Sequence, residues 1–160
     1  MKLRRYKWFL KTPIAHRGLH DNDKGVPENS LKAFELAIAS GYPIELDVHL
    51  LADGEVVVFH DKSLKRATGQ EVLIKEQDSK SIKDYKLFKT DHTIPLLREV
   101  LELVSGKVPL LIEIKNSEKS KVGDLEKRLW DHLRAYNGQY TVQSFNPYSL
   151  AWFRKNAPSV

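Results

Sequence analysis

Short apolar segments alternate along this chain with longer segments of helical periodicity, and this alternation limits the fold more than any other feature. The strand-like segments lie at residues 13–16, 43–51, 56–59, 108–114 and 140–145. The helix-like segments lie at residues 31–40, 95–104, 122–136 and 147–156. Strands that alternate with helices pair as a mostly parallel sheet with helices packed against it. The pattern therefore predicts an α/β fold.

Two stretches depart from the alternation. Residues 61–93 are polar and loop-like, with a short helix expected near residues 82–87. Asp53-Gly54 is a turn signal between the second and third strand-like segments. In a two-residue hairpin Asp47 would pair with His60, whereas a parallel crossover would place both residues at one edge of the sheet. Both topologies bring His60 towards Asp47.

Carboxylates on the predicted strands indicate a cation site. Glu45 and Asp47 are two residues apart on a strand that its apolar neighbours mark as buried, so both point to one face. Glu113 lies on the strand at 108–114, with Lys115 on the same face as a charge partner or phosphate contact. Adjacent carboxylates repel unless a cation lies between them, and oxygen ligands favour Mg²⁺, Ca²⁺ or Mn²⁺. The alternative is a solvated strand face with a simple ion pair.

Two of the histidines end apolar strands beside a charged neighbour, namely His16 and His60. Two imidazoles that flank a cation suit phosphodiester cleavage. One accepts the proton of the nucleophile and the other protonates the leaving oxygen, while the cation and Arg17 neutralise the phosphoryl oxygens. The other histidines are expected to be packed or surface residues. Among these, His49 shares a strand face with Asp47 and is a further candidate.

Short motifs along the chain resemble a known family when they are taken together. In order they are Ala15-His16-Arg17-Gly18, Pro27-Glu28-Asn29-Ser30, Glu45-Leu46-Asp47-Val48, Asp53-Gly54, Val58-Phe59-His60-Asp61, Arg66-Ala67-Thr68-Gly69, Ile94-Pro95-Leu96-Leu97, Ile112-Glu113-Ile114-Lys115 and Gln143-Ser144-Phe145. This series resembles the glycerophosphodiester phosphodiesterase family, whose relatives include phosphatidylinositol-specific phospholipases C. The resemblance extends from residue 13 to about residue 155.

The resemblance implies a TIM (β/α)₈-barrel type of fold and the hydrolysis of glycerophosphodiesters to an alcohol and glycerol 3-phosphate. It also suggests that the glycerol 2-hydroxyl attacks first and gives a cyclic phosphate, which water then opens. The implied site consists of the acid/base pair His16 and His60, the phosphate contacts Arg17 and Lys115, and the ligands of one divalent cation, Glu45, Asp47 and Glu113. Glu28 and Asn29 would order the loop after the first strand, although Asn29 or Ser30 as a helix N-cap explains that motif more simply.

The length of 160 residues is short for a closed barrel, which typically needs about 250 residues. We therefore expect one domain over residues 1–160 that holds the first five strand–helix units of an incomplete barrel and is truncated at its C-terminus. The first strand would then be an edge strand, which a second copy or another chain could complete. The alternative function is a catalytically inactive fragment that acts as a phosphoglycerol-binding or assembly module.

Composition excludes several other classes of function. The chain has no cysteine, which excludes disulfides, thiol catalysis and Cys-ligated metals. No apolar run is long enough to span a membrane and no secretory signal is evident, so we expect a cytoplasmic protein. Acidic residues are interspersed among the basic ones that give the charge of +5, so we expect no nucleic-acid partner. The resemblance implies a small-molecule glycerophosphodiester substrate. Residues 2–11 are basic and aromatic; they would either contact an anionic membrane or pack under the barrel floor.

Overall fold

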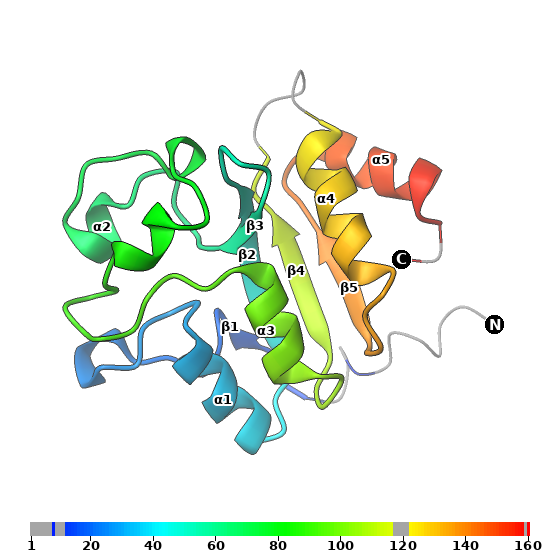
Figure 1. Ribbon diagram of the computed structural model, residues 1–160. Coiled ribbons are helices and arrows are strands. Elements are labelled where there is room, and N and C mark those ends of the chain that lie inside the picture. The colour runs from blue at the N-terminus through cyan, green and yellow to red at the C-terminus, as the bar shows by residue number, and fades with distance from the viewer. Residues whose placement is uncertain (1–7, 9–11, 117–121, 159) are drawn as a thin grey trace.

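The computed structural model describes residue 8, residues 12–116, residues 122–158 and residue 160 (Figure 1). Its helices and strands are, in chain order, β1 (Ala15–His16), α1 (Leu31–Ala39), β2 (Ile44–Leu50), β3 (Val56–Val58), α2 (Lys65–Thr68), α3 (Leu97–Val104), β4 (Leu110–Ile114), α4 (Asp124–Leu133), β5 (Tyr140–Gln143) and α5 (Pro147–Asn156). Each strand and each long helix lies within a segment that the sequence predicts. The short helix expected near residues 82–87 is a 3₁₀ helix at Ser81–Asp84.

The strands form one sheet in the order β1-β2-β4-β5, and these four strands are parallel. This confirms the mostly parallel α/β arrangement. The third predicted strand differs, because β3 pairs antiparallel with β2 and is therefore not a further barrel unit. In the described part of the chain the sheet does not close, and β1 and β5 are its edges. Completion by a second copy or another chain stays a prediction.

The connection between β2 and β3 is a hairpin with a longer loop than the turn signal suggested. Leu51 N–H donates to the Glu55 carbonyl at 2.9 Å, so the loop consists of residues 52–54. The pairing therefore shifts by one residue from the two-residue hairpin. The Asp47 carbonyl accepts from Phe59 N–H at 3.0 Å, and His60 follows this last pair. The hairpin still returns His60 to the end of β2 where Asp47 lies.

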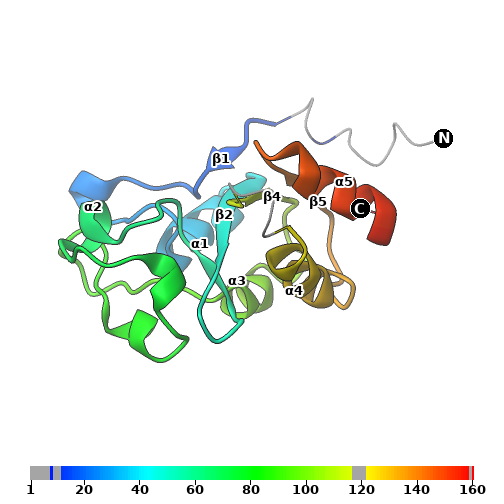
Figure 2. The same cartoon turned by 90° about the horizontal axis from the view of Figure 1, so that it is seen from above.

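Helices α1, α3 and α4 lie on one side of the sheet, as Figure 2 shows from above. The residues of β2 that face these helices are apolar, and three of them are fully buried, namely Ile44, Leu46 and Val48. Because successive side chains of a strand alternate between the two faces, the charged residues of β2 point to the opposite face. The apolar core thus fixes the face on which the carboxylates appear.

The polar stretch after β3 is a compact unit with its own small core. Loops, α2 and two 3₁₀ helices pack on the far side of the hairpin and bury a second apolar cluster. Its members are Leu51, Val57, Phe59, Leu64, Ala67, Ile74, Ile82, Leu87, Ile94 and Leu96. This cluster anchors the segment that carries His60.

The turn between β1 and α1 is held by close backbone packing. Gly18 has φ +83°, and a Cβ atom there would lie 2.8 Å from Cβ of Ala33 in α1. Ser30 caps α1, because its Oγ accepts from Ala33 N–H at 3.1 Å and donates to the Pro27 carbonyl at 2.6 Å. Arg17 also has a positive φ, of 57°, so two successive residues of this turn, Arg17 and Gly18, adopt a left-handed backbone conformation.

No described helix is long and apolar enough to cross a membrane. The basic segment 2–11, for which membrane contact was considered, lies outside the described residues except for Trp8.

Gly18→Ala should destabilise the protein by about 2–4 kcal/mol, because it adds both a left-handed backbone cost and a steric overlap with Ala33. Gly41→Ala is the matched control: Gly41 also has a positive φ, of 70°, but has open space around its Cβ position. It should lose only about 1–2 kcal/mol. Urea unfolding of both variants measures the difference, and equal losses would show that the contact with α1 is unimportant.

Candidate active site

The parallel register of the sheet brings the polar ends of the strands into one row. His16 lies opposite Glu45, and Asp47 lies opposite Glu113, which in turn lies opposite Gln143. The carboxyl ends of parallel strands are the edge at which α/β proteins and barrels build their sites. The row therefore places candidate catalytic and metal-binding groups together.

Glu45, Asp47 and Glu113 form a buried carboxylate cluster. Each offers an oxygen within 4.8 Å of the others, and the three residues are only 4%, 1% and 7% exposed. Asp47 Oδ1 is buried and meets Lys115 Nζ at 3.0 Å as an ion pair without hydrogen-bond geometry, so it keeps lone pairs for another partner. Three buried acidic side chains, each offering a carboxylate oxygen as a ligand, fit a hard divalent cation such as Mg²⁺, Ca²⁺ or Mn²⁺.

The charge of this cluster is visible in the ionisation of its members. Burial, together with the charges of Asp47 and Glu113, raises the pKa of the Glu45 carboxyl to about 7. Lys115 compensates part of the charge, since its Nζ lies 2.5 Å from Glu113 Oε1. Burial opposes the charged ammonium, but the hydrogen bond to Glu113 and the negative charges of Asp47 and Glu113 raise the pKa of Lys115.

Arg17 contacts the cluster from the β1 side. Its backbone N–H donates to Glu45 Oε2 at 3.1 Å, and its Nε lies 3.4 Å from Asp47 Oδ2. Its Nη1 donates to Glu28 Oε1 at 2.9 Å. The guanidinium thus lies beside the carboxylates, where it can meet a negatively charged group.

The two candidate acid/base residues lie at the end of β1 and shortly after β3, two strands that both pair with the edge of β2 that faces away from β4. His16 has a side chain that is 68% exposed, with Nε2 4.0 Å from Glu45 Oε2. Partial burial and the neighbouring Arg17 lower the pKa of His16. His60 is half-buried, and its Nδ1 lies 2.5 Å from Asp61 Oδ1.

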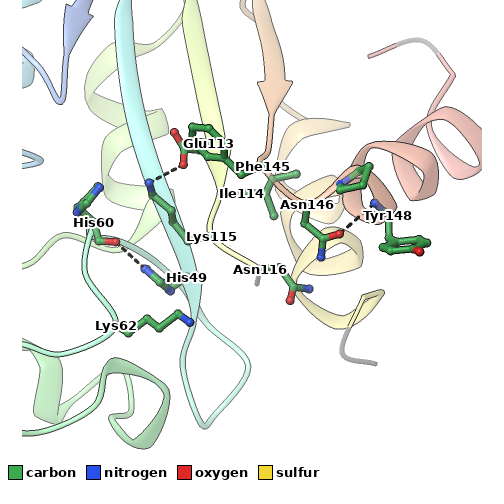
Figure 3. A pocket seen from close by; sticks show the side chains of 11 residues that line it. His49, His60, Lys62, Glu113, Ile114, Lys115, Asn116, Phe145, Asn146 and Tyr148 are labelled. Carbon is green, nitrogen blue, oxygen red and sulfur yellow. Dashed lines mark hydrogen bonds and ion pairs between the residues drawn. The ribbon is translucent and has the colours of Figure 1, made fainter. Parts of the chain in front are cut away.

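A pocket of about 420 Å³ opens at this edge of the sheet (Figure 3). Its wall includes His60, Glu113 and Lys115, and Figure 3 shows the Lys115 side chain reaching towards Glu113. Phe145, which is 93% exposed, and Tyr148 line the rim beyond β5. The pocket therefore brings two histidines, His49 and His60, one carboxylate and two lysine ammonium groups against an aromatic rim, while His16 does not line it.

The motif at Glu28-Asn29-Ser30 divides its tasks among three residues. Ser30 is the N-cap of α1. Asn29 Nδ2 instead donates to Asp47 Oδ2 at 2.8 Å, so this amide contacts the carboxylate cluster directly. Burial alone would raise the pKa of the Glu28 carboxyl, but Arg66, Asn22 and Arg17 lower it to about 2.

Several residues of the site were named in motifs or as candidates without a defined role. Gln143 Nε2 donates to Glu113 Oε2 at 3.2 Å and to Glu45 Oε1 at 3.5 Å. His49 is buried on β2, and its Nε2 donates to the His60 carbonyl at 3.1 Å. The position of Gln143 at the end of a predicted strand was a usable signal. No local pattern indicated which groups these side chains would meet.

Comparison with known proteins agrees with the fold and the motifs. The sequence model of the Glycerophosphoryl diester phosphodiesterase family matches residues 16–160. A glycerophosphodiester phosphodiesterase of Bacillus altitudinis is 37% identical over 158 residues, which cover 92% of this chain and 63% of that protein. One of Caldanaerobacter subterraneus is 39% identical over 156 residues, covering 91% and 62%. The chain thus spans about three fifths of the length of these relatives.

Among solved structures, a phosphodiesterase of Oleispira antarctica, in complex with the product sn-glycerol-3-phosphate, matches with a TM-score of 0.82 and 29% identity. The match covers 94% of this chain and 65% of that one. The predicted barrel-type fold is thereby confirmed, with the sheet open in the described residues. The chain belongs to the glycerophosphoryl diester phosphodiesterase family.

Proposed function

We propose that this chain catalyses the metal-dependent hydrolysis of glycerophosphodiesters to an alcohol and glycerol 3-phosphate. The observation that carries the proposal is the convergence of three buried carboxylates with Arg17 and Lys115 at the pocket edge, in a chain whose family is known. The relatives named as phosphodiesterases and the relative bound to sn-glycerol-3-phosphate support the substrate class.

Glu45, Asp47 and Glu113 would hold one divalent cation. When bound there, a cation would polarise a phosphoryl oxygen and stabilise the negative charge of the transition state. Arg17 and Lys115 lie beside these carboxylates and would contact the remaining phosphoryl oxygens. Phosphate binding by these side chains orients the diester relative to the histidines.

His16 and His60 would act as the acid/base pair. One imidazole accepts the proton of the attacking hydroxyl, and the other donates a proton to the oxygen of the departing alcohol. Each transfer contributes roughly 10²–10⁴-fold to the rate.

Glu28 and Asn29 would order the loop between β1 and α1. Glu28 accepts from Arg17, and Asn29 donates to Asp47, so the loop is fastened to both the phosphate contact and the carboxylate cluster. Ordering this loop keeps Arg17 beside the carboxylate cluster before substrate arrives, which reduces the entropy lost on binding.

Turnover provides the first test. The folded protein should hydrolyse glycerophosphocholine in the presence of Mg²⁺, Ca²⁺ or Mn²⁺, and His60→Ala should lower kcat roughly 10²–10⁴-fold without loss of cation binding. His132→Ala, on α4, is the matched control and should keep full activity. A folded protein that binds a cation but cleaves neither this diester nor bis(p-nitrophenyl) phosphate would contradict the proposal and favour a phosphoglycerol-binding module.

Cation binding provides the second test. Glu45→Gln and Glu113→Gln should each weaken the binding of the supporting cation at least about 10-fold, because each removes a charged oxygen ligand. Glu102→Gln, an exposed carboxylate of α3, should leave the affinity unchanged. Calorimetric titration of metal-free protein measures the affinities. Equal affinities in all three variants would place the cation elsewhere.

The role of Glu28 predicts a pH-dependent stability. Its pKa of about 2 in the folded protein lies below the ordinary value of 4.5, so its contribution is present above 4.5 and is lost as the pH falls towards 2. Glu28→Gln should therefore lower the free energy of unfolding by about 1–3 kcal/mol at neutral pH, and this deficit should shrink on acidification. Urea unfolding across the acidic range measures both. A deficit that is independent of pH would show that Glu28 acts through packing alone.

A further inference from the structure

Asp61 and Arg66 lie next to the proposed site but have no part in the chemistry described above. Asp61 follows His60 at the end of the hairpin, and Arg66 lies in α2. Arg66 Nε donates to Asp61 Oδ2 at 2.6 Å, while Asp61 Oδ1 lies 2.5 Å from His60 Nδ1. One carboxylate therefore bridges a guanidinium and an imidazole.

The protonation of this bridge follows from its donors. An arginine side chain stays protonated in proteins, so Arg66 Nε is always a donor. Burial alone would raise the pKa of the Asp61 carboxyl, but the hydrogen bonds and charges of Arg66 and His60 lower it. An ionised carboxylate only accepts hydrogen bonds. A neutral His60 must then carry its proton on Nδ1, which leaves Nε2 with a free lone pair.

Arg66 itself is fixed on several sides. Its Nη1 and Nη2 donate to the two oxygens of Glu28 at 3.1 and 2.6 Å. The ring of Phe88 lies 5.5 Å from the guanidinium carbon, and Phe88 adopts a positive φ of 49°, a strained conformation for an aromatic residue. Glu28 also accepts from Arg17, so the chain of contacts joins the phosphate contact to His60.

We propose that Arg66 and Asp61 are positioning residues for His60. Asp61 holds the His60 imidazole in its Nδ1–H tautomer, and Arg66 occupies one carboxylate oxygen of Asp61 so that the other oxygen accepts from His60. This inference rests on the proposed function only in the use made of Nε2, which is the atom that exchanges protons with the substrate. Glu28 and Phe88 hold Arg66 in place. The arrangement is thus set before substrate binds.

The decisive variant is Asp61→Asn, which keeps the shape of the side chain. Because Arg66 Nε–H needs an acceptor, the amide oxygen will turn towards Arg66, and the amide NH₂ will face His60 Nδ1. Nδ1 must then accept, so the proton of neutral His60 moves to Nε2 and the tautomer inverts. Long-range ¹H–¹⁵N NMR of metal-free protein at about pH 9, where an ordinary histidine is neutral, reports the tautomer directly.

The second variant tests the part played by Arg66. In Asp61→Asn/Arg66→Met the amide no longer faces a fixed donor, so its oxygen can turn to His60 and the Nδ1–H tautomer should recover. The matched control is Asp61→Asn/Arg98→Met. Arg98 pairs with Glu55 and has a 49% exposed side chain, against 44% for Arg66, and its removal should leave the tautomer inverted.

The outcomes separate this inference from the proposed function. An Nδ1–H tautomer in the unaltered protein that inverts in Asp61→Asn supports the inference, whether or not the protein turns over a diester. An Nε2–H tautomer in the unaltered protein, or the same tautomer in both, overturns it. Where glycerophosphocholine is cleaved, Asp61→Asn should lower kcat roughly 10²–10⁴-fold with little change in KM, since the substrate contacts remain.

Discussion

The rest of this structure depends on three carboxylates that the sheet forces together away from water. The helices bury the apolar face of β2, and the parallel pairing of β2 with β4 sets Asp47 beside Glu113 on the other face. Like charges in this position are costly unless positive groups lie close. Lys115 and Arg17 supply this positive charge, and Arg17 lies beside the cluster in a left-handed backbone conformation. Burial together with the negative charge of the cluster raises the pKa of Glu45, and the same negative charge explains why a divalent cation suits the cluster.

Compensation does not stop at the residues that touch the cluster. Arg17 is a cation beside the carboxylates, so it needs its own partner on the outer side, and this partner is Glu28. Glu28 is in turn shared with Arg66, and Arg66 with Asp61. Charges thus alternate in sign from the carboxylate cluster to Asp61, which contacts the second histidine. Arg17, Glu28 and Arg66 each contact two neighbours of opposite charge, which favours one arrangement of the whole network over many local ones.

Sequence patterns predicted what depends on strand periodicity and strand ends. The spacing of Glu45 and Asp47 on a buried strand fixed their common face, and the mostly parallel sheet brought Glu113 to them. The sequence patterns did not predict two features, because both depend on how separate segments of the backbone are placed in the fold. The hairpin loop is one residue longer than the turn dipeptide predicted, because Leu51 pairs with Glu55. Arg66 lies in a polar segment without periodicity, so nothing in the local pattern linked it to Glu28, 38 residues earlier.

The origin of the two histidines carries a further consequence. His16 ends a strand of the parallel sheet. His60 instead lies on an arm of the structure that consists of the antiparallel strand β3 and the segment after it, which has a separate apolar core. The proposed acid/base pair is therefore held by two packing units, which the β2–β3 pairing and the charges of Glu28 and Arg66 join. A small displacement of the arm would change the distance of His60 from the phosphate while leaving the carboxylate cluster intact. Cation binding and turnover are thus expected to respond differently to changes in the arm, because only turnover requires both units to keep their relative positions.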